Sequence, residues 1–512
     1  MVPLLLFASS ALAQTSSLEQ AYESTWAPRL VPLLTEAIRF QTVAGNAEAF
    51  TEQKAWLTRV AADLGFTVRD RGKVVEVELP GPAGSPVLGL AVHGDVVPVD
   101  DHWTIPPFDG VLKDGMVLGR GAADDKGPLV QALLAMKTLQ ESGKARTHTI
   151  RLLVGNDEET GSSDMKEYVR DHQPPDFTLV LDSNFPVIVG EKAWNALTVE
   201  TTLNDRRPSR FKITSIVAGL AASIVPDSAV LQIELLAPTE SGAHTDAKFF
   251  QALETRLNAK TLPAGTRLEI KNEGNANIAG GSAPGSRIRL TVRGKAAHAG
   301  VNPSGGRNAM VALANLSVNE LPEGGARDIL AFAQLAGQDL QGTGLGLTHV
   351  DAVFGRVIAV PTMIRVLPDG KMRLTINIRS NPILSGDALK KHLHAEVAAF
   401  NARTGASLEA GGTFTSQPLA FDPQAKLVKR LLTAYARSTG KAELPAVSGG
   451  GTYAKVLPNA IPFGMWFPDK PYPGHDVDEQ ISVADLHKGA RVLLSALSDL
   501  ACTEPIKEPF MP

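Results

Sequence analysis

The chain has 512 residues, 44% of them hydrophobic and 20% charged, which is enough apolar material for a large core and for more than one domain. Lys and Arg number 50 and Asp and Glu number 54, so the formal net charge is only −4. This weak charge argues against nucleic acid or an anionic membrane as partner. The single cysteine, Cys502, excludes an intrachain disulfide and a Cys-rich metal site, so any metal must be held by His and carboxylates.

The first residues have the composition of an export signal. A short apolar run in residues 1–13 ends in Ala11-Leu12-Ala13, the small-x-small form of a signal-peptidase site. The run is shorter than the ~20 residues that cross a bilayer, so we expect no membrane span. No Lys or Arg precedes it, which indicates an atypical signal or a true start upstream of Met1. We predict an exported protein, periplasmic or secreted.

The next part of the chain alternates helical and strand patterns. Helices are predicted over 18–40 and 47–64, and a third begins near Pro128 and ends at Gly143. Short apolar runs are typical of strands, and they occur at 74–79, 87–92, 150–154 and 177–181. This alternation indicates an α/β sheet covered by helices on both faces.

The pattern changes over residues 193–411 and then returns. Amphipathic strands at 197–203, 287–292 and 372–378 are interleaved there with helices at 247–257 and 386–400, which favours a separate α+β unit. A helix at 425–438, a strand at 461–467 and a helix at 483–500 follow, and Pro462 restricts that strand to an edge or to a start at Pro462. We therefore predict a catalytic α/β domain over 18–192 and 412–505, interrupted by an inserted domain over 193–411.

Acids and histidines follow several of the predicted strands. The residues are His93 and Asp95 after the second run, Asp157, Glu158 and Glu159 after the third, Asp182 after the fourth, and His475 after the last strand. Open α/β sheets bind ligands beyond the carboxyl ends of their strands, so we expect these side chains to converge. Three consecutive acids repel one another unless cations or protons neutralise them. Mixed His and carboxylate donors suit zinc, and two ions could activate one water together.

A glycine-rich segment, residues 119–127, precedes the helix that begins near Pro128. Its glycines permit a tight turn, and its acids stand where a helix N-terminus favours negative charge. We assign Asp124 in this segment as the carboxylate that bridges both ions.

Each of these residues also has a structural interpretation. A single His after a strand is usually structural, Asp182 could cap a helix or form a turn, and the acids at 157–159 could be a solvated loop. Asp124 could cap the next helix, and His475 could lie in a surface turn. These interpretations would all have to hold at once, whereas one metal site explains all the residues together.

Five segments of the sequence resemble the M20 metallopeptidases, and most closely their dipeptidase branch. They are residues 91–98, Trp103 with Pro107-Phe108, 119–127, 157–162 and 449–454. The resemblance implies a zinc aminopeptidase-like α/β/α catalytic domain with an inserted, ferredoxin-like α+β lid. It also implies two zinc ions: His93 and Asp182 hold one, Glu159 and His475 hold the other, and Asp124 bridges them. Asp95 would orient His93, Glu158 would be the general base for a water between the ions, and a cis peptide would join Asp124 to Asp125.

The resemblance also implies three roles in the inserted domain and one in the 449–454 segment. His298 would stabilise the oxyanion, and Arg379 would bind a substrate carboxylate. Taken alone, these two residues could equally be an exposed His and a surface salt bridge. Ser223 and Gly450 would contact substrate. The dipeptidases often carry Asn where Ser223 stands, so the preferred substrate stays open.

The sequence therefore predicts zinc-dependent hydrolysis of dipeptides. The size of the insert is typical of the dipeptidase branch, in which a monomer supplies its own lid histidine. Three alternatives within the family are an aminoacylase, a carboxypeptidase and an N-succinyl amino acid hydrolase. A further alternative is a non-catalytic zinc-binding or peptide-binding protein, but a structural site has no use for a base such as Glu158.

Overall fold

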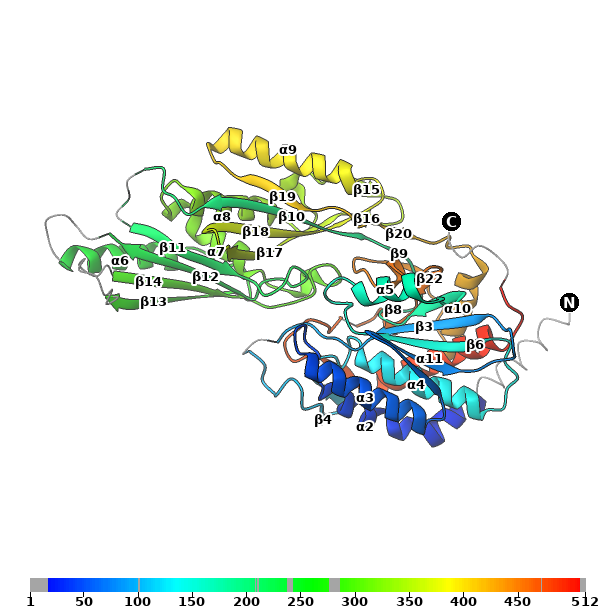
Figure 1. Cartoon of the computed structure of the whole chain (residues 1–512). Helices are drawn as coiled ribbons and strands as arrows, with labels where there is room; N and C mark the ends of the chain where they lie inside the picture. The colour runs from blue at the N-terminus through cyan, green and yellow to red at the C-terminus, as the bar shows by residue number, and fades with distance from the viewer. Residues whose placement is uncertain are drawn as a thin grey trace. The chain divides into compact units, whose positions relative to one another are not determined.

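The computed structural model describes residues 17–99, 102–207, 209, 211–236, 243–275, 286–470 and 472–506. The predicted signal, residues 1–13, lies outside them. The chain divides into two compact units: unit 1 is Met1–Glu191 with Leu419–Pro512, and unit 2 is Lys192–Pro418 (Figure 1). The inserted unit continues past the predicted boundary at residue 411 because β19 (Glu409–Thr413) pairs with a strand of unit 2. Within the described residues, no helix combines the length and apolarity that a bilayer crossing requires.

Unit 1 is built on a six-stranded mixed sheet. Its strand order is β1 (Thr67–Arg71), β2 (Val74–Leu79), β6 (Thr149–Gly155), β3 (Val87–His93), β7 (Phe177–Val180) and β22 (Ala460–Pro462). Strand β3 runs parallel to both β6 and β7, and β22 runs parallel to β7. Strands β1 and β2 add antiparallel neighbours at the other edge. The predicted apolar runs thus form the centre of the sheet, whereas β1, with its exposed polar residues, was not predicted.

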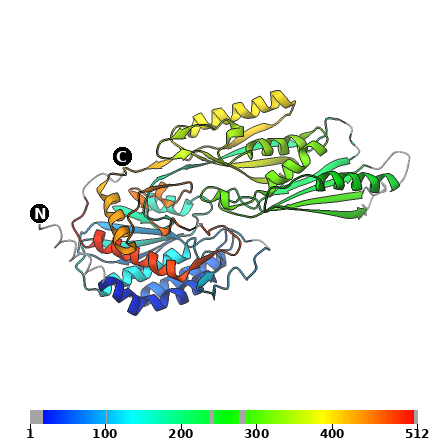
Figure 2. The same ribbon diagram turned by 180° about the vertical axis from the view of Figure 1, so that it is seen from behind.

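Helices cover both faces of this sheet, as the sequence predicted. The larger core contains α2 (Ala27–Ile38), α3 (Ala47–Asp63), α4 (Lys126–Glu141), α10 (Lys426–Thr439) and α11 (Val483–Ala501). Leu90 of β3 points into this core, and its neighbour Ala91 points into a smaller one with α5 (Ser163–Asp171), because successive strand residues face opposite sides. Figures 1 and 2 show α2, α3, α4 and α11 gathered on one side of the sheet.

Two predicted elements of unit 1 differ from the structure. The predicted helix over 18–40 contains a π-helical segment, Tyr22–Trp26, directly before α2. The predicted strand over 461–467 is interrupted, because the chain pairs with β7 as β22 and then with β8 (Ser183–Asn184) as β23 (Met465–Trp466). A cis peptide bond joins Gly464 to Met465 at this change of partner. Pro462 ends an edge strand, which is one of the two positions predicted for it.

Besides the central sheet and the β8–β23 pair, the described residues of unit 1 form two smaller sheets. Strands β4 (Val111–Lys113), β5 (Met116–Leu118) and β24 (Gln480–Ser482) form one. Strands β20 (Leu419–Ala420), β9 (Ile188–Glu191) and β21 (Ala446–Ser448) form the second, and β15 (Val350–Asp351) with β16 (Gly355–Arg356) is a hairpin of unit 2. The β5–β24 pairing matters for the site because each strand adjoins a segment with a predicted ligand.

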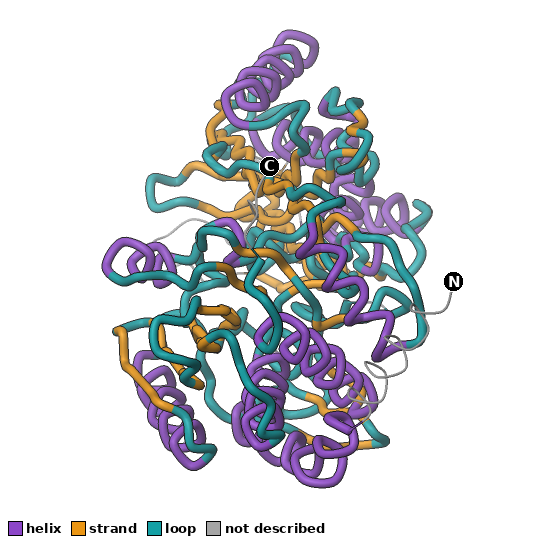
Figure 3. Tube along the Cα trace, turned by 90° about the vertical axis from the view of Figure 1, so that its right-hand side faces the viewer, coloured by secondary structure: helices purple, strands orange, loops and turns teal. Residues whose placement is uncertain are grey.

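Unit 2 is an eight-stranded antiparallel sheet with helices packed on it. The order is β13 (Arg267–Asn275), β14 (Ser286–Arg293), β12 (Ser228–Leu235), β11 (Phe211–Ala218), β17 (Ile358–Val366), β18 (Lys371–Ser380), β10 (Ala193–Thr202) and β19. The helices are α6 (Ala243–Asn258), α7 (Ala309–Ser317), α8 (Gly325–Ala336) and α9 (Gly386–Thr404). Figure 3 shows strands in orange and helices in purple.

The predicted ferredoxin-like pattern is present in unit 2. Elements β10, α8, β17, β18, α9 and β19 occur in that chain order and form a βαββαβ pattern, interrupted after β10 by the segment that contains β11 to β14, α6 and α7. Their strand order in the sheet is β17-β18-β10-β19. Strands β11 to β14 extend this sheet beyond β17, which accounts for the size of the insert. The α/β/α domain with an inserted α+β domain is therefore confirmed.

Candidate metal centre

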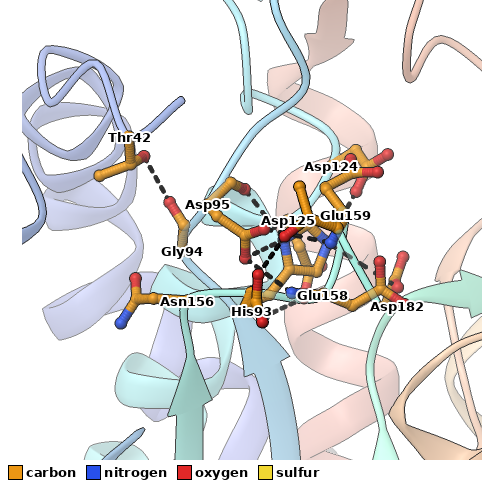
Figure 4. Close-up of polar contacts among 12 residues, drawn as sticks. Thr42, His93, Gly94, Asp95, Asp124, Asp125, Asn156, Glu158, Glu159 and Asp182 are labelled. Carbon is orange, nitrogen blue, oxygen red and sulfur yellow. Dashed lines mark hydrogen bonds and ion pairs between the residues drawn. The ribbon is translucent and has the colours of Figure 1, made fainter. Parts of the chain in front are cut away.

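The predicted ligands of unit 1 meet at one edge of the central sheet. His93 ends β3, Glu158 and Glu159 follow β6, and Asp182 follows β7. Because β3 is parallel to β6 and β7, these three strand ends lie side by side. Figure 4 shows His93, Glu158, Glu159 and Asp182 pointing toward one another and toward Asp124, which comes from the turn before α4.

Asp124 contacts both predicted histidine ligands. Its Oδ1 lies 3.0 Å from His93 Nε2, and its Oδ2 lies 3.3 Å from His475 Nε2. His93 Nε2 is also 3.8 Å from Asp182 Oδ2, and His475 Nε2 is 2.8 Å from Glu159 Oε1. The structure therefore brings all five predicted ligands together, with one oxygen of Asp124 facing each histidine.

Two overlapping groups of donor atoms could hold metal ions. Ligand atoms of His93, Asp124 and Glu159 lie within 4.8 Å of one another, and so do those of His93, Glu158 and Asp182. Glu158, predicted as the base, is thus close enough to be counted with the ligands. Imidazole and carboxylate donors in this number fit a pair of divalent ions, and their type suits zinc.

The negative charge of the cluster is poorly solvated. Burial raises the pKa of the Asp182 carboxyl well above its usual value, and the charges of Asp124 and Asp125 add to the effect. Burial also raises the pKa of Glu158 well above its usual value; the charge of His93 opposes this rise, and the charges of Glu159 and other acids add to it. Partly buried carboxylates this close are unfavourable unless positive charge lies between them, and divalent cations supply that charge.

The two histidines respond to the same acids in the opposite direction. Burial favours the neutral ring, but hydrogen bonds with Asp124 and Asp95 hold the pKa of His93 well above its usual value. For His475, the charge of Glu159 and the hydrogen bond with Asp124 outweigh burial and raise the pKa to about 10. Both Nε2 atoms therefore face concentrated negative charge, which is also what a cation requires.

Asp95 has a second role that the sequence did not reveal. Its Oδ1 lies 3.5 Å from His93 Nδ1, although the shorter contact of that nitrogen, 2.9 Å, is with the main-chain oxygen of Asp95. The carboxylate also accepts hydrogen bonds from the N–H groups of Glu158 and Glu159, at 3.2 and 3.1 Å. Asp95 therefore positions the turn that carries the predicted base as well as facing the His93 ring.

Sequence reasoning missed three further polar residues of this centre. Asp125, joined to Asp124 by the predicted cis peptide bond, accepts a hydrogen bond from the His93 N–H at 3.1 Å. The Tyr472 hydroxyl donates to Asp124 Oδ2, and Glu479 accepts hydrogen bonds from the Asp124 segment. Tyr472 and Glu479 stand close to His475 in the sequence, but neither follows an apolar run, so strand-end reasoning could not find them.

The 449–454 segment also belongs to unit 1. The Tyr453 hydroxyl donates to Asp164 Oδ2 at 2.6 Å, and the same oxygen accepts from the N–H groups of Asn156 and Asp157, at 2.6 and 3.0 Å. The segment therefore braces the turn that leads to Glu158. Gly450 donates its N–H to Ser448 Oγ at 2.9 Å, and its predicted substrate contact stays a prediction.

His298 lies in unit 2 with a defined ring tautomer. Its Nδ1 accepts hydrogen bonds from the N–H groups of Gly300 and Val301, at 3.0 and 2.8 Å. An acceptor nitrogen carries no proton, so the proton of the neutral ring is on Nε2. His298 is thus prepared to donate a hydrogen bond through Nε2.

The other two predicted residues of unit 2 are connected to His298 through hydrogen bonds. The main-chain oxygen of Ser223 accepts from the N–H of Ala299 at 2.7 Å. Arg379 Nε donates to Asn377 Oδ1 at 3.1 Å, and Asn377 Nδ2 donates to the oxygen of Ala222 at 2.8 Å. The chain of contacts therefore runs from Arg379 through Asn377 to the Ser223 segment and on to His298.

Comparisons with known proteins agree with the predicted family and fold. Residues 89–499 match the sequence model of a family described as Peptidase family M20/M25/M40. The Bacillus subtilis protein named "Putative dipeptidase YtjP" is 28% identical over 480 residues, which cover 92% of this chain and 95% of that protein. Human carnosine dipeptidase 1 and the dipeptidase Dug1p from Saccharomyces cerevisiae are similar in structure, with TM-scores of 0.56 and 0.57. Both are 14% identical, and each alignment covers 94% of this chain and 98% of the other, so they show a shared fold.

Proposed function

Because this chain belongs to peptidase family M20/M25/M40 and is a hydrolase of the metallopeptidase class, we propose that it is a zinc-dependent dipeptidase. The observation that carries the proposal is the cluster at the edge of the central sheet. There, Asp124 faces His93 at 3.0 Å and His475 at 3.3 Å, with Glu159 and Asp182 beside them. A cluster of this composition serves metal-assisted hydrolysis better than a role in stability, because its charges oppose folding unless cations are bound.

The five ligands divide between two ions in this proposal. His93 and Asp182 would hold one zinc, Glu159 and His475 would hold the other, and Asp124 would contribute a carboxylate oxygen to each. When bound, the ions polarise the scissile carbonyl and lower the pKa of the attacking water. The 3.8 Å contact between His93 and Asp182 and the 2.8 Å contact between His475 and Glu159 support this pairing.

Glu158 is the general base in this mechanism. It takes a proton from the attacking water and delivers it to the leaving nitrogen. Burial raises the pKa of its carboxyl above the usual value, which brings the proton affinity closer to that of the groups with which it exchanges protons. The hydrogen bond from the Glu158 N–H to Asp95 holds the backbone of the base.

Two residues of unit 2 bind the substrate in this mechanism. His298 donates a hydrogen bond from its Nε2–H to the oxyanion of the tetrahedral intermediate, and the hydrogen bonds to its Nδ1 support that tautomer. Arg379 binds the substrate carboxylate, with its guanidinium oriented through Nε by Asn377. Ser223 and Gly450 contact the remainder of the substrate.

Hydrolysis of the amide bond of dipeptides is the favoured reaction. The Bacillus subtilis relative that aligns over 92% of this chain is named "Putative dipeptidase YtjP". The assay compares free dipeptides, N-acetyl amino acids, N-succinyl amino acids and longer peptides with purified, zinc-loaded protein. We expect the highest kcat/KM on free dipeptides. Activity confined to acylated amino acids would contradict the dipeptidase assignment and favour an aminoacylase or an N-succinyl amino acid hydrolase, and activity on longer peptides alone would favour a carboxypeptidase.

Export and a monomeric state complete the proposal. The apolar run of residues 1–13 supports export, and the extension of the unit 2 sheet by β11 to β14 supports a monomer that supplies its own lid histidine. Fractionation of the source cells tests the first, and light scattering of the purified protein tests the second. A stable dimer would contradict the self-supplied lid.

A further inference from the structure

A buried carboxylate outside the predicted ligand set holds the backbone of Asp124. Glu479 Oε1 accepts hydrogen bonds from the N–H groups of Ala123 and Asp124, at 2.8 and 3.0 Å. Its Oε2 accepts from the N–H of Gly121 at 3.0 Å and from Arg120 Nη1 at 2.8 Å. Glu479 is 1% exposed, and hydrogen bonds to a buried charge are stronger than those between neutral groups.

Glu479 also lies at the junction of the two segments that carry Asp124 and His475. Strand β5 leads into the Asp124 segment, and β24 directly follows the His475 segment. The two strands pair antiparallel, with Leu118 opposite Gln480, so both segments leave the pair at the same end. The Gly119 N–H extends the pairing through a 2.9 Å hydrogen bond to the main-chain oxygen of Glu479.

Arg120 connects this arrangement to the Trp103 motif, for which the mechanism has no role. Its guanidinium lies over the Trp103 ring, 5.0 Å from the centroid, while Nη1 pairs with Glu479. Its N–H donates to the main-chain oxygen of Pro107 at 2.8 Å. Arg120 thus neutralises Glu479 and anchors it to the 103–107 segment.

We propose that Glu479 is a positioning residue for the metal centre. Its carboxylate holds the backbone that presents Asp124 in the place where both ions need it, and its main chain ties that backbone to the segment of His475. The inference rests on the proposed function, because it assumes that Asp124 and His475 are metal ligands. Residues that orient a ligand typically change metal affinity by about 10 to 100-fold when they are replaced.

The test compares Glu479→Gln with Glu76→Gln, a matched control in unit 1. Glu76 is also a buried carboxylate, 2% exposed, and accepts a hydrogen bond from the Tyr168 hydroxyl at 2.7 Å. Among the described residues, its hydrogen bonds and ion pairs involve none of the predicted metal ligands. In Glu479→Gln, an NH2 group replaces one carboxylate oxygen and cannot accept the hydrogen bonds that this oxygen accepts. Zinc affinity is measured by competition with a chromophoric chelator. We expect Glu479→Gln to bind zinc at least about 10-fold more weakly than the natural chain, and Glu76→Gln to bind within about twofold of it.

A folding measurement and a second variant separate loss of metal affinity from loss of the fold. Circular dichroism and the unfolding temperature of the metal-free proteins show whether each variant folds. If Glu479→Gln does not fold, Glu479→Asp decides by the same competition, because it keeps the charge beside Arg120 but withdraws the oxygens from the backbone. Unchanged zinc affinity in a folded Glu479 variant overturns the inference alone. If the natural chain itself binds no divalent ion, the proposed function falls, so the two failures are distinguishable.

Discussion

The two clusters of predicted functional residues are stabilised in different ways. In unit 1, side chains of opposite charge contact one another, as His475 Nε2 contacts Glu159 at 2.8 Å and Asp124 at 3.3 Å. In unit 2, His298 and Arg379 have hydrogen bonds with neutral groups: two backbone N–H groups donate to His298 Nδ1, and Arg379 Nε donates to Asn377 Oδ1. The first cluster therefore needs added positive charge to be stable, whereas the second is already stabilised and needs a ligand only for function.

Metal removal gives the largest expected difference between the two clusters. Exhaustive chelation should abolish peptide hydrolysis and destabilise unit 1. An ion that binds only the folded state raises the free energy of unfolding by about 4 kcal/mol when its concentration is a thousand times its Kd, and chelation removes this contribution. Hydrogen exchange should accelerate in the segments around Asp124 and Glu158 and stay unchanged in strands β11 and β12 of unit 2. Added zinc should restore both activity and protection. If hydrogen exchange accelerated equally in the two units, the two clusters would not differ in their need for metal.

Replacement of Glu158 separates catalysis from metal binding within unit 1. Glu158→Gln should lower kcat by about 100 to 10,000-fold, the usual contribution of a general base, while the protein still binds two zinc ions. The zinc content is measured by atomic absorption on the same samples that are assayed. Glu167→Gln on α5, half exposed and beside Lys73, is the control and should behave like the natural chain. Loss of zinc together with activity would instead make Glu158 a ligand, in line with its proximity to His93 and Asp182.

Replacement of His298 tests whether the unit 2 cluster acts in catalysis. His298→Ala should lower kcat by about 100-fold, because one oxyanion donor is lost, and should leave zinc affinity unchanged. His392→Ala is the matched control, because His392 is also a unit 2 histidine and its Nε2 lies 2.9 Å from the main-chain oxygen of Leu345. An unchanged kcat in His298→Ala would discard the oxyanion role.

The smallest expected effect concerns Arg379. Arg379→Lys should raise KM for dipeptides by about tenfold with little change in kcat, because an ammonium cannot reproduce a two-pronged contact with a carboxylate. Dipeptide amides, which lack the carboxylate, should show no such change. Arg373→Lys on the same strand, where Arg373 pairs with Glu200, should leave both substrates unaffected. The prediction fails if KM rises as much for the dipeptide amides as for the free dipeptides.

Much of the fold could be predicted because its central elements have strong local patterns. The apolar runs of β3, β6 and β7 and the helices α3, α4 and α11 were found within a few residues of their bounds. Short or polar elements were missed, among them β1 and α5, because their stability comes from neighbouring elements rather than from their own composition. The break in the predicted strand at 461–467 likewise depends on two partner strands that the local sequence does not specify.

The candidate site divides in the same manner. His93, Asp182 and the acids after β6 could be identified from the sequence alone, because each directly follows an apolar run and parallel strand ends must meet. Only the tertiary structure decided that Asp95 holds the turn of Glu158, that Tyr472 contacts Asp124 and that Glu479 holds the Asp124 backbone. The last two contacts join residues separated by 348 and 355 positions. No local pattern encodes such contacts, since they exist only after β5 and β24 have paired and burial has left the backbone N–H groups in need of an acceptor.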